Sequence, residues 1–252
     1  MAYISLEHVV KRYKMGEVTI TAVDDITFEI EKGEFVIIVG PSGAGKTTVL
    51  NILGGMDACD EGTILVDGKE ISKCNSRQLT TYRRYDIGFV FQFYNLIQNL
   101  TALENVELAA QICKEPLPAQ EVLCHVGLGE RLNNFPAQLS GGMLQRAAAA
   151  LLLALHPRYI LADEPTSALD AENRTLLLEL LEKQRETAGI LFISHDVAAL
   201  RALCGTVYVM EHGMLTEQGT MQELLEHPKQ AWTKEYAAAN RPVNREGWTW
   251  TD

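Results

Sequence analysis

Gly40-Pro41-Ser42-Gly43-Ala44-Gly45-Lys46-Thr47-Thr48 is the stretch of sequence that decides the fold. It fits the pattern G-x-x-x-x-G-K-[ST], which is typical of a loop that binds the phosphates of a nucleotide. The apolar run Phe35 to Val39 indicates a buried strand before the loop, and Thr47 to Leu53 indicates a helix after it. A glycine-rich turn that happens to contain a lysine is the alternative, and it is less favoured because both flanks fit. The sequence therefore predicts a phosphate-binding loop between a strand and a helix.

The residue types of this loop predict its chemistry. Gly40, Gly43 and Gly45 allow tight turns, so that successive backbone N–H groups and the N-terminus of the next helix face one anion. We expect Lys46 to reach the β- and γ-phosphates and the Thr47 hydroxyl to bind Mg2+. The predicted ligand is therefore a nucleotide together with a magnesium ion.

Composition indicates a globular protein with a substantial core. The chain has 252 residues, of which 47% are hydrophobic, enough for one large α/β domain with an insertion or for two small domains. The 22 basic residues are outnumbered by 33 acidic ones, which gives a formal net charge of −11. Broad contact with a nucleic-acid backbone is therefore not expected, and any phosphate binding must be local.

The sequence offers no signal for secretion or for crossing a membrane. Its N-terminus lacks the basic and apolar regions of a signal peptide, and the longest aliphatic run, Ala147 to Leu155, is much shorter than the roughly 20 residues of a membrane helix. The five cysteines are scattered and form no C-x-x-C pair, so neither a disulfide framework nor a zinc site is indicated. We expect a cytoplasmic protein.

Polar side chains follow three further apolar segments. These segments are predicted strands, namely Ile87 to Phe91 before Gln92, Tyr159 to Ala162 before Asp163 and Glu164, and Ile190 to Ile193 before Ser194 and His195. Adjacent carboxylates at the end of a buried strand are costly without a partner, which favours a metal ion and a catalytic water there. Gln92 has a simpler alternative as a loop-capping glutamine. Parallel strands would bring all these side chains to one sheet edge beside Lys46 and Thr47.

Two other regions complete the predicted organisation. Short alternating segments from Ile4 to Ile30 predict an antiparallel β layer, in which Tyr13 either stacks on a nucleotide base or is an ordinary half-buried strand residue. Helical character from about Leu100 to Pro157 predicts an insertion, and within it Ser140-Gly141-Gly142 reads as a helix N-cap or as a second anion site. We expect a helix and an irregular tail at 231–252, following a domain at 1–230.

Six separated motifs resemble those of the ATP-binding cassette (ABC) ATPases. They are Gly40 to Thr48, Gln92, Leu139 to Gly142, Ile160 to Thr166, Ser167 to Asp170, and His195. The resemblance implies an α/β fold, a P-loop NTPase (RecA-like) core with a largely parallel sheet, an N-terminal antiparallel β layer and a helical subdomain inserted at about 93–157. Other segments, such as Ile87 to Gln92 and Leu100 to Glu107, look most like the subfamily for macrolide export, lipoprotein release and antimicrobial-peptide export.

The same resemblance implies an assembly. It is a head-to-tail homodimer that holds two ATP molecules with Mg2+, each between the phosphate loop of one subunit and the Ser140-Gly141-Gly142 segment of the other. Tyr13 would stack on the adenine and Asp170 would cross the dimer interface. Separate integral membrane permease subunits would complete a transporter, so the chain would lie on the inner face of the cell membrane.

Catalytic roles are carried over by motif position. Asp163 would be the Mg2+ carboxylate, Glu164 the general base on the attacking water, and His195 a contact to the γ-phosphate. Lys46 would stabilise the developing charge, while Gln92 would touch Mg2+ and report to the membrane partner. The implied reaction is in-line phosphoryl transfer from ATP to water.

Three features depart from the family pattern. Met143 replaces a usual glutamine, Leu151 replaces a usual arginine, and the insertion between Glu107 and Leu139 is shorter than is usual for the subfamily. Met143 and Leu151 leave room for a weakly hydrolysing regulatory protein. A soluble ABC ATPase of assembly or repair is a second alternative, although such proteins usually carry two cassettes or long coiled coils, which this sequence lacks.

Overall fold

The computed structural model describes residues 2–91, 96–112, 116–167, 169–203 and 205–240. In these ranges a six-stranded sheet has the order β10-β9-β3-β8-β7-β6. Its strands are β3 (Phe35–Val39), β6 (Ile87–Phe91), β7 (Tyr159–Asp163), β8 (Gly189–Ile193), β9 (Thr206–Glu211) and β10 (Met214–Gly219). Neighbouring strands pair in parallel except β9 and β10, which are antiparallel. The prediction of a largely parallel sheet is confirmed.

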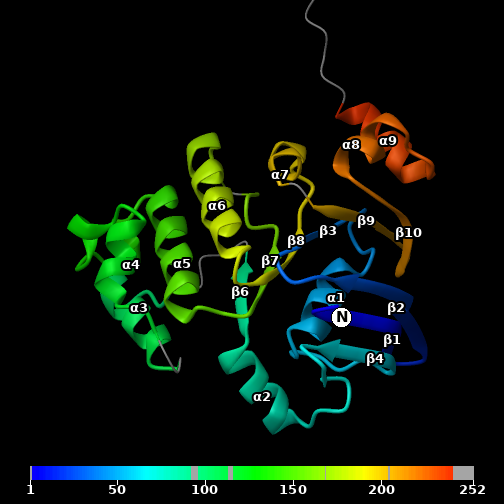
Figure 1. The fold of residues 1–252 in the computed structure, drawn as a ribbon, viewed down its shortest axis with the longest axis horizontal. Helices are drawn as coiled ribbons and strands as arrows, with labels where there is room; N and C mark the ends of the chain where they lie inside the picture. The colour runs from blue at the N-terminus through cyan, green and yellow to red at the C-terminus, as the bar shows by residue number, and fades with distance from the viewer. Residues whose placement is uncertain (1, 92–95, 113–115, 168, 204, 241–252) are drawn as a thin grey trace, which may run out of the picture.

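A smaller antiparallel sheet covers one face of this large sheet (Figure 1). It consists of β1 (Ile4–Met15), β2 (Val18–Ile30), β4 (Glu61–Val66) and β5 (Lys69–Glu70). A turn at Asp67-Gly68 joins β4 to β5, and Gly16 lies in the turn between β1 and β2. This sheet is the expected N-terminal β layer.

The strand before the phosphate loop shows why the large sheet is covered on both faces. Every residue of β3 is buried, and alternate side chains enter different cores. Val36 and Ile38 pack toward the smaller sheet and α1 (Lys46–Leu53), while Phe35, Ile37 and Val39 pack toward the helices on the opposite face. A strand buried on both sides is continuously apolar, as the sequence pattern predicted.

The remaining helices surround the sheets. On the face opposite the smaller sheet lie α6 (Ala171–Gln184), α7 (Val197–Ala202), α8 (Met221–Glu226) and α9 (Ala231–Ala239), and α2 (Ser76–Tyr85) leads into β6. Of these helices, the sequence analysis predicted α9 but missed α2, α6 and α7. The signal for α2 was present, because Asn75 and Gln78 form a capping box at its start.

A group of helices with its own core lies beside the sheets (Figure 1). It contains α3 (Ala102–Ala110), α4 (Ala119–His125) and α5 (Gly141–Leu155), with single 3-10 turns at Gly129–Arg131 and Pro136–Gln138. Thr101 and Glu104 form a capping box at the start of α3. The inserted helical subdomain of the predicted fold is therefore present.

Some sequence predictions fall outside the described residues. They concern Gln92, parts of the insertion expected at about 93–157, and the irregular tail expected at the end of 231–252. Among the helices that the structure describes, each is too short or too polar to cross a lipid bilayer.

Candidate active site

The phosphate loop turns sharply between β3 and α1 because glycine occupies its crowded positions. A Cβ atom at Gly40 would lie 2.0 Å from the carbonyl oxygen of Met210, and one at Gly45 would lie 2.1 Å from that of Ala22. Gly45, the residue before α1, has a φ of 105°, which side-chain-bearing residues rarely adopt. The loop therefore presses against β2 and β9 and presents its backbone at the start of α1.

Lys46 folds back over this loop. Its Nζ donates hydrogen bonds to the carbonyl oxygens of Gly40 (2.7 Å) and Pro41 (2.8 Å). Burial lowers the pKa of Lys46, while the carboxylates of Glu164 and Asp163 act in the opposite direction. The ammonium group is thus held at the loop, next to the two carboxylates that the sequence singled out.

Asp163, the last residue of β7, reaches the first turn of α1. The Thr47 hydroxyl donates a hydrogen bond to Asp163 Oδ2 over 3.0 Å. The hydroxyl and carboxylate oxygens are hard ligands for a metal ion, and at this separation both could bind the same ion. Mg2+ commonly binds through one or two such protein ligands, with phosphates and waters as the others. The donor set therefore fits Mg2+.

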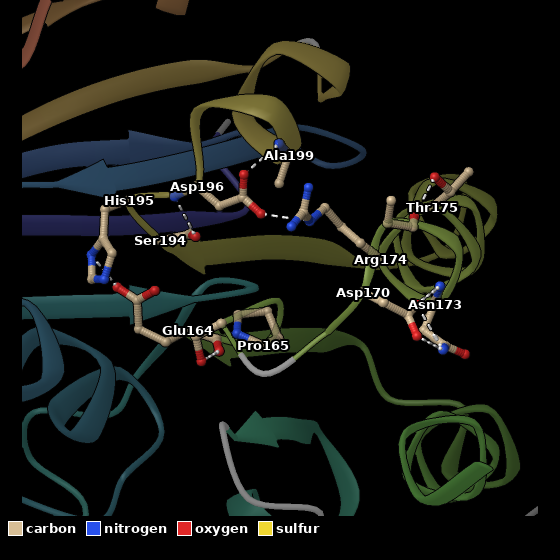
Figure 2. A network of polar contacts seen from close by, with 12 residues as sticks. Glu164, Pro165, Asp170, Asn173, Arg174, Thr175, Ser194, His195, Asp196 and Ala199 are labelled. Carbon is tan, nitrogen blue, oxygen red and sulfur yellow. Dashed lines mark hydrogen bonds and ion pairs between the residues drawn. The ribbon is translucent and has the colours of Figure 1, made fainter. Parts of the chain in front are cut away.

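Glu164 follows in a strained conformation and contacts His195 (Figure 2). Its φ is 48°, and its N–H donates to the carbonyl oxygen of Ile193 over 2.8 Å. Glu164 Oε1 lies 2.7 Å from His195 Nδ1, with side-chain exposures of 16% and 66%. Burial raises the pKa of Glu164, and the nearby imidazole opposes that effect. A half-buried carboxylate with a raised pKa at a strand end has the properties of a general base.

These groups surround one cavity of about 590 Å³. The phosphate loop, Asp163, Glu164 and His195 line it, as the argument from parallel strand ends predicted. Ile20 and the His212-Gly213 turn also line it, and sequence reasoning had assigned them no role. That turn is fixed there because Gly213 N–H donates to the Ala44 carbonyl oxygen over 3.0 Å.

Tyr13 lies outside the lining of this cavity but close to it. It pairs across the β1–β2 ladder with Ile20, which does line the cavity. The ring is 37% exposed, and its hydroxyl donates a 2.7 Å hydrogen bond to Asp57 Oδ2. Tyr13 is therefore a partly exposed ring, anchored at its hydroxyl end, at the edge of the site.

The second predicted anion position is separate from the first. Ser140 caps α5 by accepting a hydrogen bond from Met143 N–H (3.4 Å), and with Gly142 it lines a different cavity of about 530 Å³. The Asp170 carboxylate accepts hydrogen bonds from Asn173 N–H and Nδ2, both over 2.9 Å. Within one chain, Ser140 and Asp170 do not join the phosphate-loop cavity.

The two unusual residues of α5 are packed in the helical core. Met143 and Leu151 are both half-buried against the cluster that α3, α4 and α5 share. On the same helix, the buried Gln145 donates from Nε2 to the Pro165 carbonyl oxygen over 3.1 Å, which joins α5 to the residue after Glu164.

Comparison with known proteins identifies the family. The family described as "ABC transporter" matches residues 23–167. The chain belongs to the ABC transporter family. An uncharacterized ABC transporter ATP-binding protein of Thermotoga maritima is 47% identical over 195 residues, 75% of this chain and 83% of that protein. The methionine import ATP-binding protein MetN 1 of Listeria innocua is 38% identical over 245 residues, 94% of this chain and 72% of that protein.

Solved structures lead to the same family. The dimeric ATP-binding cassette MJ0796, in a post-hydrolysis state with ADP and Pi bound, has a TM-score of 0.78 and 38% identity. The match covers 86% of this chain and 98% of that one. This ABC protein is thus the ATP-binding and ATP-hydrolysing subunit of a transporter, and the predictions of the ABC fold, ATP binding and ATP hydrolysis are confirmed. The Listeria innocua relative is named for methionine import and not for the predicted export subfamily.

Proposed function

We propose that two copies of this chain close head to tail around two ATP molecules. In this arrangement the phosphate loop of one copy and the Ser140-Gly141-Gly142 segment of the other bind the same nucleotide. The observation that carries the proposal is the separation of two anion-binding geometries into different cavities of one chain. The similar cassette MJ0796 is described as dimeric, with ADP and Pi bound.

The hydrolytic step follows from the positions of the side chains around the phosphate loop. Lys46 and the loop N–H groups stabilise negative charge on the phosphates as the bond to the leaving oxygen breaks. Glu164 takes a proton from the attacking water, and His195 holds that carboxylate and contacts the γ-phosphate. Thr47, Asp163 and, as a sequence-based proposal, Gln92 would hold Mg2+, which would neutralise negative charge on the phosphates.

The remaining proposals concern the assembly. Separate permease subunits in the membrane would meet the helical subdomain at about 93–157 and place the chain on the inner face of the cell membrane. The division into a cassette at 1–230 and a C-terminal element at 231–252 also stays a prediction. Membership of the export subfamily is likewise a prediction. The relatives named MetN are described as methionine import proteins, which favours the opposite direction of transport. The membrane protein that co-purifies with this chain would decide between these transporter classes.

Ser140→Arg tests the shared site. Bulk and charge at this exposed helix start should prevent ATP-induced dimerisation while Mg-ATP affinity of the monomer stays nearly unchanged. The measurement is size-exclusion chromatography with and without ATP in a Glu164→Gln background, which suppresses hydrolysis, together with a nucleotide-binding titration. A large loss of monomer affinity would mean that the segment acts within its own chain and would refute the proposed dimer site.

A further inference from the structure

The segment from Ser194 to Asp196 carries the imidazole of the active site but belongs to no helix or strand. It follows β8 directly and precedes α7. The His195 side chain is 66% exposed, so packing around the ring contributes little to its placement. Whatever fixes the backbone of this segment therefore determines where the imidazole lies relative to Glu164.

One side of the segment is fixed by α6 (Figure 2). Arg174 Nε lies 2.7 Å from Asp196 Oδ2, with side-chain exposures of 29% and 20%. The other carboxylate oxygen, Oδ1, accepts a hydrogen bond from Ala199 N–H over 3.3 Å at the start of α7. A short ion pair that is largely shielded from water is stronger than an exposed one, which typically contributes little. Asp196 is thus tied to two elements at once.

The other side of the segment is fixed by α9. The Tyr236 hydroxyl donates a hydrogen bond to the His195 carbonyl oxygen over 3.3 Å. The Tyr236 ring stacks on Trp232, with centroids 4.8 Å apart and an interplanar angle of 18°.

The helix that carries Tyr236 is itself anchored to the edge strand β10. The buried Glu217 carboxylate accepts hydrogen bonds from the N–H groups of Lys229 (3.0 Å) and Gln230 (3.1 Å), directly before α9. A carboxylate at the start of a helix satisfies N–H groups that would otherwise lack partners. Helix α9 is therefore held firmly enough to present the phenol to His195.

We propose that Arg174 and Tyr236 are positioning residues for ATP hydrolysis, which together clamp the Ser194–Asp196 segment so that His195 meets Glu164. The inference rests on the proposed roles of Glu164 and His195. The contact that the clamp preserves is the 2.7 Å approach of His195 Nδ1 to Glu164 Oε1. Small displacements of such groups slow catalysis strongly, because the reacting atoms must be aligned.

The test uses conservative variants of both clamp residues. Tyr236→Phe keeps the stacked ring but removes the hydroxyl, and Arg174→Gln removes the charge. Each should lower kcat for ATP hydrolysis by roughly 3- to 10-fold, the effect of one lost hydrogen bond or ion pair, with KM for ATP unchanged. Arg174→Lys should restore part of the rate.

Matched controls exist elsewhere in the chain. Arg185→Gln changes the arginine that directly follows α6, which has a similar exposure of 32% and donates to the Gly33 carbonyl oxygen. Tyr82→Phe removes a hydroxyl that donates to the Leu53 carbonyl oxygen over 2.9 Å. Both controls should keep kcat within about twofold of the unchanged protein, and thermal denaturation would check that all variants are folded.

The decisive comparison repeats the two clamp variants in a His195→Ala background. If the clamp acts through His195, neither variant should slow the residual hydrolysis any further. Equal losses in both backgrounds, or full kcat in Tyr236→Phe and Arg174→Gln, would overturn the clamp. Full activity of His195→Ala alone would instead refute the proposed role of His195, so the two failures are distinguishable.

Discussion

The two helix starts that can face an anion, at the phosphate loop and at Ser140, differ in what surrounds them. Around the start of α1 lie an ammonium group, a carboxylate pair and an imidazole, all within one cavity. Around the start of α5 lie Arg146, Asn173 and the carboxylates Glu172 and Glu179, without a lysine or a strand-end base among the lining residues. The start of α1 therefore has side chains that could catalyse ATP hydrolysis, whereas the start of α5 has only side chains that could bind a ligand. In the proposed dimer, the two helix starts would therefore contribute different parts of one nucleotide site.

Removing the catalytic base should produce the largest change. Glu164→Gln should lower ATP turnover by about 100- to 10,000-fold, because the amide cannot accept the proton of the attacking water. ATP binding should persist, since the phosphate loop is untouched, and the dimer should become long-lived. Steady-state hydrolysis and size-exclusion chromatography measure the two effects. Near-normal turnover would show that Glu164 is not the catalytic base, so the start of α1 would no longer differ from the start of α5 in having one.

A smaller effect is expected from crowding the start of α5. Gly142→Ala places a Cβ atom 2.2 Å from Asn173 Nδ2, so the helix start or the asparagine must shift. Overpacking of this size should weaken ATP-induced dimerisation by roughly 5- to 100-fold, with monomer affinity for ATP unchanged. Analytical ultracentrifugation gives the dimer constant.

Asn173→Ala supplies the matching control for that substitution. It removes the obstructing amide, so the double variant should dimerise better than Gly142→Ala alone. A double variant no better than Gly142→Ala would show that the contact with Asn173 is not what restricts this position to glycine.

The smallest effect concerns the edge of the phosphate-loop cavity. If Tyr13 stacks on adenine, Tyr13→Ala should weaken ATP binding by about 2- to 12-fold, the usual value of an aromatic pair. Tyr13→Phe should retain affinity because only the hydrogen bond to Asp57 is lost. Titration with ATP and with inorganic triphosphate distinguishes base stacking from a general effect. Equal weakening for both ligands would favour an ordinary strand tyrosine.

Sequence reasoning succeeded where short, local patterns determine the structure. The phosphate loop, the strand that ends at Asp163 and the cap at Ser140 are all encoded within a few neighbouring residues. Because parallel strands end at the same edge of the sheet, these local patterns were enough to predict that Lys46 and Glu164 lie in one site.

Contacts between distant segments could not be predicted in this way. The bond from Tyr236 to His195 and the ion pair from Arg174 to Asp196 each join different elements, and no local pattern specifies such partners. The place of the His212-Gly213 turn beside the phosphate loop depends on how β9 lies in the sheet. The subfamily and the membrane partner depend on surfaces that meet other proteins.

The strand order also has a consequence for folding during translation. The phosphate loop follows β3, but β3 is flanked in the sheet by β8 and β9, which begin at Gly189 and Thr206. Helices α3, α4 and α5 are neighbours in sequence and can pack as they emerge, whereas pairing of distant strands is slow. The nucleotide site is thus completed only after β8 and β9 have been synthesised, which is later than the helices of the helical subdomain.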